Sequence, residues 1–384
     1  MAGIYVSGGT YSGSGGVTTD WVKNGSTSPS SVFIAPDGTL TLTLDTNDPS
    51  SGQRALRNDG TFTHNDGTVY VNVSTSAGTY AKLDARASYY NVIIKNDGSD
   101  TNRVQMDNSD ASIANDLTIN SSGRHLTVGR IAIIESGGTI DMNNTSANDA
   151  TFGTLAIMDD GTYDATSGTT SITSAFYGDH YAWDNNLGGT FTHNSGSVSF
   201  DYQTSYQNVR NSSQWFYNVI STNRETTYQA GLQWMSNAKI ANDLTVVSGA
   251  SSWFSSDNPV VSGNVICSGN IGRWRYPPPP GASVYTTPTG DWTFGSVEVG
   301  GDGELGLSSE TVTINNKNGD DYKFRVLNNC IVSASAGTLI LDASTEGGMY
   351  HNTGSNGKEL YNLTVKNDTT SARAVQNVGD VTVT

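Results

Sequence analysis

The chain has 384 residues, and 20 lysines and arginines against 36 aspartates and glutamates give it a formal net charge of −16. Serine, threonine and asparagine fill 128 positions and glycine another 43, which excludes a mostly helical fold because these residues favour turns and strands over helix interiors. The acidic balance provides no basic stripe for phosphates or anionic lipid, so we expect neither nucleic acid nor membrane as a partner.

Residues 1–35 are rich in glycine and serine and contain few apolar strand runs. They predict an irregular N-terminal arm that contributes little to the core and serves as an attachment element. The start of the chain lacks a basic segment followed by an apolar one, and no stretch of about 18 apolar residues occurs. We therefore expect neither a secretory signal nor a membrane span.

Short strands follow the arm. Residues 39–44 alternate threonine with leucine, so that all leucines fall on one face of a strand. An Asp-Gly-Thr triplet recurs at residues 37–39, 59–61, 66–68 and 160–162, where we expect glycine to supply the positive φ of a corner. Strands this short with regular corners predict an all-β fold, an elongated parallel β-solenoid similar to a β-helix.

Internal repetition is the strongest signal in the chain. Three segments return in the same order, at offsets of 129, 127 and 127 residues. They are Gly60–Val69 with Gly189–Val198, Tyr90–Ile93 with Tyr217–Ile220, and Ile113–Ile119 with Ile240–Val246. A weaker third copy begins at Gly337. The repeats predict a first unit at 36–188, a second at 189–336 and a third, incomplete unit at 337–384.

His64 and His193 occupy equivalent positions of the repeat. They would lie a whole unit apart and could not ligate one metal ion. We expect each to be a neutral imidazole that hydrogen-bonds backbone groups at a corner.

The densest polar and aromatic cluster lies at residues 177–184. There Asp179 and Asp184 could flank a sugar stacked on Trp183, as a glycoside hydrolase would require two carboxylates. The alternative is an exposed loop between coils, and no motif of known mechanism accompanies the cluster. We expect no catalytic residues and no enzyme activity.

Six of the seven tryptophans fall in the second unit or just before it. Trp274 and Trp292 lie on either side of a tetraproline at 277–280, which cannot donate ladder hydrogen bonds and should form an extended loop. Two interpretations stay open: a contact surface for a protein or glycan partner, or large fillers for the core. The candidate contact residues are Asp179, Trp183, Asp184, Trp274 and Trp292.

No cofactor and no metal ion are expected. The segment 300–305 is similar to a calcium-binding nonapeptide but has Leu305 where that motif needs aspartate, and it has no tandem copies. Asp159, Asp160 and Asp164 fit a solvated turn better than a cation site. Cys267 and Cys330 are too few for a disulfide framework, so a bridge between them is optional.

The sequence of the repeats resembles β-solenoid repeats of tailed-phage virion proteins and of bacterial surface adhesins. The resemblance covers residues 55–384 and rests on Gly-Thr-Phe-Thr-His-Asn-x-Gly-x-Val, then Tyr-Asn-Val or Tyr-Asn-Leu, then Asn-Asp-Leu-Thr. It implies a structural repeat and no activity. Because no secretory signal is expected, the virion is favoured over the adhesin.

The resulting hypothesis is a non-enzymatic structural protein on the virion surface, acting as a fibre or capsid decoration protein. Its expected partners are other virion proteins of the capsid or tail, copies of itself in a homo-oligomer for which a trimer is the first expectation by analogy, and a host-surface glycan. The alternatives are a bacterial adhesin or extracellular filament subunit at the cell surface, and a glycan-binding or polysaccharide-cleaving tailspike.

Overall fold

The computed structural model describes most of the chain, with gaps. The described residues are 3–25, 31–43, 54–73, 81–84, 87–96, 103–107, 111–113, 116–120, 125–134, 136–142, 149–175, 180–185, 188–201, 206–212, 214–222, 231–235, 238–254, 258–271, 274–275, 285–286, 291–300, 303–315, 322–327, 330–333, 336–344, 348–352, 358–366, 375–378 and 382–383. They fall into two compact units, Met1–Tyr177 with Asp184–Gly196, and Gly178–Trp183 with Ser197–Thr384.

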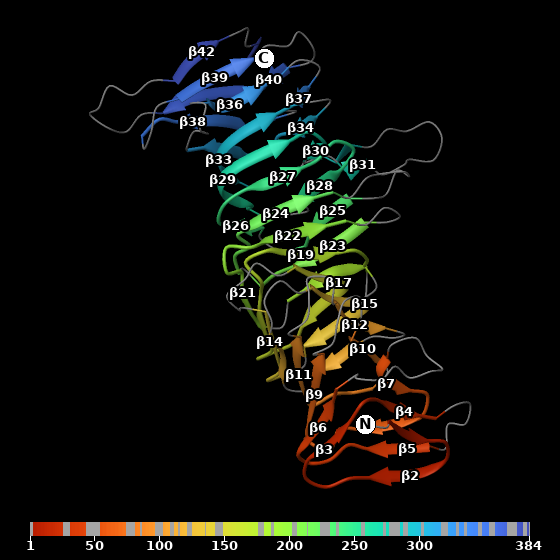
Figure 1. The fold of residues 1–384 in the computed structure, drawn as a ribbon. Helices are drawn as coiled ribbons and strands as arrows, with labels where there is room; N and C mark the ends of the chain where they lie inside the picture. Colours follow the sequence, from red (N-terminus) through yellow and green to blue (C-terminus); the bar gives the residue numbers. More distant parts are fainter. Residues whose placement is uncertain are drawn as a thin grey trace, which may run out of the picture. The chain divides into compact units, whose positions relative to one another are not determined.

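The fold is all-β, and the described residues contain no helix. Its parallel sheets stack as a β-solenoid, in which strands of successive rungs pair side by side (Figure 1). The prediction of an all-β parallel solenoid is confirmed. The repeat boundaries at 36–188, 189–336 and 337–384 stay predictions.

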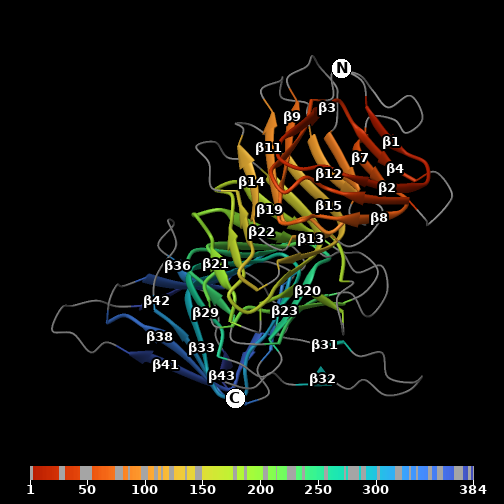
Figure 2. The ribbon, with the colours of Figure 1, turned by 90° about the horizontal axis from the view of Figure 1, so that it is seen from below.

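Three parallel walls enclose the core of the first unit (Figure 2). The first contains β1 (Ile4–Val6), β4 (Val22–Asn24), β7 (Arg54–Asn58), β10 (Ala81–Asp84), β12 (Arg103–Asp107), β15 (His125–Ile134), β17 (Asp149–Ile157) and β19 (Thr169–Ile172), and β13 (Ala111–Ile113) pairs with the second half of β15. The second contains β2 (Gly9–Ser12), β5 (Ser31–Ile34) and β8 (Thr61–Thr63). The third, the eight-stranded sheet, contains β3 (Val17–Thr19), β6 (Thr39–Leu42), β9 (Thr68–Val73), β11 (Asn91–Asn96), β14 (Asp116–Asn120), β16 (Thr139–Asp141), β18 (Thr162–Asp164) and β21 (Thr190–Thr192).

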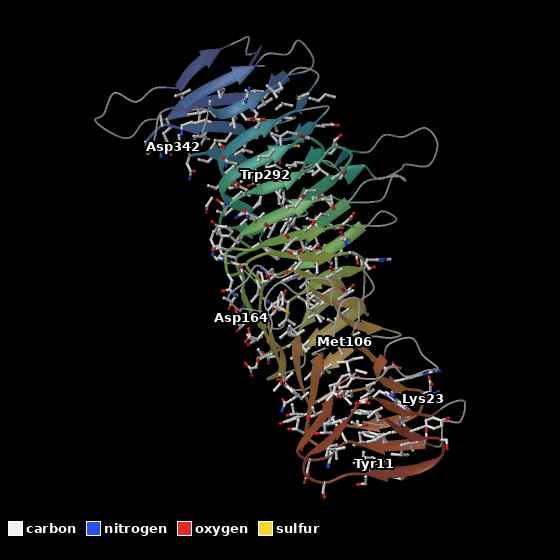
Figure 3. The ribbon with its side chains drawn as sticks, in the orientation of Figure 1. Tyr11, Lys23, Met106, Asp164, Trp292 and Asp342 are labelled. Carbon is white, nitrogen blue, oxygen red and sulfur yellow. The ribbon has the colours of Figure 1, made fainter. Side chains whose placement is uncertain are left out.

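The core of the first unit is built from columns of residues that stack in register from rung to rung. One column follows the inner face of the eight-stranded sheet through Leu40, Val69, Val92, Leu117, Ile140, Tyr163 and Phe191, all of them buried. A ladder of aromatic rings begins at the first rung, where Tyr11 stacks on Phe33 at 4.8 Å between ring centroids (Figure 3). It continues from Phe33 to Phe62 at 5.8 Å and to Tyr89 at 5.5 Å. Such contacts add to the free energy of burial.

The prediction of an irregular arm at residues 1–35 is wrong for the residues described there. They form β1 to β5, which pair in parallel with later strands and place Phe33 in the core. The pattern was missed because these strands have only three or four residues, and glycine and serine separate them. The segment is therefore part of the stack.

The second unit also has three parallel walls. The first contains β22 (Ser197–Phe200), β24 (Asn218–Ser221), β27 (Leu244–Val246), β29 (Val260–Cys267), β33 (Trp292–Val299), β36 (Tyr322–Val326), β39 (Gly348–Asn352) and β42 (Val375–Val378). The second contains β20 (Tyr181–Asp184), β23 (Tyr206–Arg210), β25 (Gly231–Trp234), β28 (Ser251–Phe254), β30 (Asn270–Ile271), β34 (Glu304–Gly306), β37 (Ile331–Ser333), β40 (Lys358–Leu360) and β43 (Thr382–Val383). The third contains β26 (Lys239–Ile240), the first halves of β29 and β33, β35 (Thr311–Ile314), β38 (Thr338–Asp342) and β41 (Asn362–Lys366). Outside these walls, β31 (Trp274–Arg275) pairs antiparallel with β32 (Tyr285–Thr286).

The corner glycines have a different role from the one predicted. Gly38, Gly60 and Gly67 do not adopt positive φ. At each of them a Cβ atom would collide with a backbone carbonyl oxygen of another rung; for Gly67 that oxygen belongs to Pro36. Glycine is needed at these corners because the backbones of two rungs approach too closely to leave room for a Cβ atom.

Candidate functional site

The predicted contact residue Trp183 lies in the core of the second unit. Its side chain is fully buried, and its indole N–H donates a 3.0 Å hydrogen bond to the side-chain oxygen of Asn211. Its ring meets Phe216 edge-on at 5.1 Å. A sugar cannot stack on a ring in this position.

The two carboxylates predicted beside Trp183 do not form a described pair. Asp184 ends β20 and is only 7% exposed, whereas Asp179 lies outside the described residues. Because Trp183 is buried, the predicted arrangement of the two carboxylates around a sugar stacked on its ring is wrong.

Trp292 is also a core residue, in β33 of the second unit (Figure 3). Its ring lies 5.3 Å from Phe254 and 5.8 Å from Phe294. The related Trp234 is 1% exposed and donates its indole N–H to the hydroxyl of Ser252. For these tryptophans the structure fits the core-filler interpretation.

Trp274 belongs to the antiparallel pair β31 and β32, and its side chain is outside what the structure describes. The tetraproline at 277–280 also lies outside the described residues. In contrast, the ring of Trp215 is 38% exposed, and the Lys239 ammonium lies 5.8 Å from its centroid. Trp215 was not among the predicted contact residues, because residues 215–217 align with Tyr89 and Tyr90 of the first repeat and were expected to be core at alternate positions. In the structure, Phe216 is the buried ring of this segment.

The equivalent histidines adopt the same corner geometry. The backbone N–H of Asp66 donates to Nδ1 of His64, and that of Ser195 donates to Nδ1 of His193, both at 3.0 Å. Each histidine is followed by two residues with positive φ, and its carbonyl accepts a bond from the glycine three positions on, as in a type I′ turn. The prediction that both histidines bind backbone groups at corners is confirmed.

Carboxylates in both units act as acceptors between rungs. Side-chain oxygens of aspartates accept backbone N–H bonds of 2.7 to 3.1 Å from residues 20 to 26 positions away in the chain. The pairs are Asp37 with Gly15, Asp84 with Asn58, Asp149 with Thr169, Asp243 with Asn264, and Asp291 with Thr311. Each bond gives a backbone amide an acceptor in another rung. The two long repeats also share a polar contact, because Asn91 donates to Thr68 and its equivalent Asn218 donates to Ser197.

Both cysteines are buried free thiols. The Cys267 thiol donates to the Gly269 carbonyl at 3.1 Å, and the Cys330 thiol donates to the Val299 carbonyl at 3.2 Å. Burial raises the pKa of Cys267 to about 12, so this thiol stays protonated at neutral pH and is a poor nucleophile.

The remaining candidate site is the outer face of the eight-stranded sheet. Two columns of side chains alternate there with the core column, and hydroxyl and amide groups predominate in them. The first column contains Thr39, Thr68, Asn91, Thr139, Thr162 and Thr190, and the second contains Thr18, Thr41, Tyr70, Ile93, Asp141, Asp164 and Thr192. At about 4.8 Å between strands, this face presents a regular row of polar groups to solvent.

Asp164 lies at this outer face (Figure 3), where its carboxylate accepts a 2.6 Å bond from the side-chain amide of Asn194. Asp141 is its partner in register on the neighbouring strand. This is a pair of adjacent carboxylates that sequence spacing alone did not reveal, because the two residues are brought together only by the strand register.

Neither a membrane span nor a metal centre is seen in the described ranges. They include no helix long and apolar enough to cross a bilayer. They also hold no group of three or more His, Cys, Asp or Glu side chains that could bind a metal ion.

Comparisons with protein-family models, with curated proteins and with solved structures found no match to this chain. The resemblance to phage and adhesin repeats therefore rests on the sequence of the repeats alone.

Proposed function

We propose that this protein is a non-enzymatic structural protein of a tailed-phage virion, a fibre or capsid decoration protein exposed on the particle. Its partners are capsid or tail proteins and copies of itself. The virion assignment derives from the resemblance of the repeat segments, and the structural role derives from how the chain uses its reactive groups.

The observation that carries the structural role is the rung-to-rung bonding of the aspartates. Asp84 and Asp243 illustrate it: each binds a backbone amide in a neighbouring rung at 3.0 and 2.7 Å. A carboxylate that accepts a hydrogen bond from a backbone amide stabilises the stacked rungs and is less available as a general acid or base. The large aromatic residues act in the same way, because Trp183, Trp234 and Trp292 are buried and fill the core. The aspartates and the buried tryptophans thus contribute to the stability of the fold.

Immunogold electron microscopy tests the virion assignment. Antibody raised against the purified protein should label particles released by lysis of the host and banded in a density gradient, and particles from a strain with the gene deleted should not be labelled. Label on intact, unlysed cells with none on particles would overturn the proposal and favour the adhesin alternative.

A second candidate function, contact with a host polysaccharide, is favoured by two surface features. Trp215 presents an exposed ring beside Lys239, and the outer face of the eight-stranded sheet pairs Asp141 with Asp164 in register. Exposed aromatic rings stack on sugars, and neighbouring carboxylates are what polysaccharide cleavage requires. The two features are tested separately. Titration of the wild type and of W215A with host polysaccharide tests binding at the exposed ring, which W215A should weaken. A reducing-end assay of the wild type and of D141N/D164N tests cleavage at the carboxylate pair.

A further inference from the structure

Four consecutive strands in the first wall of the first unit carry a group of basic residues. The strands β4, β7, β10 and β12 pair in parallel one after another. Their basic residues, which we call the basic stripe, are Lys23, Arg54, Arg57, Lys82 and Arg103. These are five of the 20 lysines and arginines of a chain whose net charge is −16. The acidic balance of the sequence indicates no basic stripe, but strand pairing assembles one from residues that are far apart in the chain.

The basic stripe lies on the outer face of this wall. A buried column of inward residues runs through Val22, Leu56 and Leu83. Lys23 pairs in register with Arg57, and Lys82 pairs with Arg54, at positions beside this column. Because successive residues of a strand alternate between the two faces of a sheet, both pairs occupy the face away from the core. Figure 3 shows Lys23 on the outer side of the wall.

The acidic residues of these strands lie at the margin of the stripe. Asp84 and Asp107 are the last residues of β10 and β12, and Asp84 is buried and accepts the backbone N–H of Asn58 at 3.0 Å. Just beyond β7, Asp59 accepts a 2.6 Å bond from Nε of Arg57. This bond uses one of the five N–H donors of the guanidinium group, so Arg57 can bind a second carboxylate.

The same outer face continues past the stripe with uncharged polar residues. In register with Lys82 follow Gln105, Thr127, Thr151 and Ser171, in β12, β15, β17 and β19. The two threonines and the serine are half-buried, so they present hydroxyl groups at the surface. Strands are about 4.8 Å apart, which is close to the length of one sugar ring in an extended polysaccharide.

We propose that this outer face binds an extended anionic polysaccharide. Its carboxylates pair with the basic stripe through charge-assisted hydrogen bonds, and its hydroxyls bond to the column that ends at Ser171. An aromatic ring adjoins the stripe as well, because the Lys23 ammonium lies 5.1 Å from the centroid of the Tyr5 ring. Rings of this kind stack on sugars.

Charge density favours a polysaccharide over a nucleic acid. Duplex DNA carries one negative charge about every 1.7 Å, whereas a polyuronate carries one for each sugar ring. The net charge of −16 repels the denser polyanion more strongly. The proposal rests on the second candidate function for its class of partner, but it names the charge of the polysaccharide and places binding on a different face from Trp215 and from the pair Asp141 and Asp164.

The test is isothermal titration calorimetry of the full chain with sodium polygalacturonate, and with dextran as the uncharged control. The wild type should bind polygalacturonate and not dextran, and the affinity should fall as salt is added. K23Q/K82Q should weaken binding by about tenfold or more, because hydrogen bonds to charged groups are stronger than neutral ones. K358Q/K366Q removes the same number of lysines from β40 and β41 of the second unit and should bind like the wild type.

Two further variants keep the test informative. Circular dichroism and melting temperature check that each protein is folded, and K82Q/R103Q replaces K23Q/K82Q if that variant unfolds. W215A should bind polygalacturonate like the wild type. Loss of binding in W215A with none in K23Q/K82Q would overturn this proposal and leave the second candidate function in place.

Three other results would also overturn it. One is a wild type that does not bind polygalacturonate, and a second is equal binding by the wild type and K23Q/K82Q. The third is tighter binding of single-stranded DNA than of polygalacturonate, which would make a nucleic acid the partner of the basic stripe.

Discussion

The backbone N–H of Ser195 donates a hydrogen bond of 3.0 Å to Nδ1 of His193, and this bond requires a neutral imidazole. Burial lowers the pKa of His193 below its ordinary value of 6.5. The folded state thus binds fewer protons than the unfolded state, and the corner is most stable above that value. The stability is lost as the pH falls through the lowered pKa.

The first prediction concerns this corner. As the pH falls below 6.5, the free energy of unfolding of the wild type should decrease more than that of H193Q, by no more than the about 0.5–1.5 kcal/mol that one hydrogen bond contributes. Urea unfolding followed by tryptophan fluorescence measures it. Equal pH dependence in H193Q and the wild type would contradict the prediction.

The second prediction concerns backbone contact at the corners. G67A and G196A should each lower the free energy of unfolding by about 1–3 kcal/mol, because the new methyl group collides with the carbonyl oxygen of Pro36 or Thr166. G8A is the matched control, since a Cβ atom there meets nothing within 4 Å. Chemical denaturation compares the three, and a loss as large in G8A would show that the corner contact is not the cause.

A third prediction separates buried from exposed tryptophan. W292A should destabilise the protein by about 3–5 kcal/mol, because it leaves a cavity between Phe254 and Phe294. W215A should change stability by less than about 1 kcal/mol, since its ring is 38% exposed. Thermal melts of the two variants check the difference, and similar melting temperatures would contradict it.

The fourth prediction is that the thiols are chemically silent in the native protein. Cys267 and Cys330 are buried, and the raised pKa of Cys267 keeps it protonated at pH 8. Ellman's reagent should therefore label neither within minutes in buffer and both after unfolding in guanidinium chloride. Fewer than two thiols in the unfolded chain would reveal a bridge, and fast labelling in buffer would show that the thiols are accessible.

The fold class could be predicted from the sequence because the same strand and corner patterns recur along the solenoid. The alternation of Thr39–Leu42 and the matched corners at His64 and His193 are local patterns, and each survives in the structure. The strands at Ile4–Val6 and Gly9–Ser12 were missed because they contain too few residues to show a period. Their register comes from the neighbouring rungs, which a local pattern does not contain.

The candidate site was harder to predict for a related reason. In Tyr181–Asp184 the last three residues are all buried, so the strand departs from the alternation that would place Trp183 and Asp184 on opposite faces. Asp141 and Asp164 are 23 positions apart and become neighbours only through strand pairing. Sequence spacing therefore identified residue types suited to a site, and the register determined which of them meet.

The aspartate bonds between rungs bear on how the protein responds to mechanical force. They join residues 20 to 26 positions apart, so a rung peeled from its neighbour frees a chain segment of that length. At about 3.3–3.6 Å per extended residue, each detachment would lengthen the chain by about 65–95 Å. A single molecule pulled from one end should extend in many small, nearly equal steps. A globular domain, in contrast, unfolds in a single event.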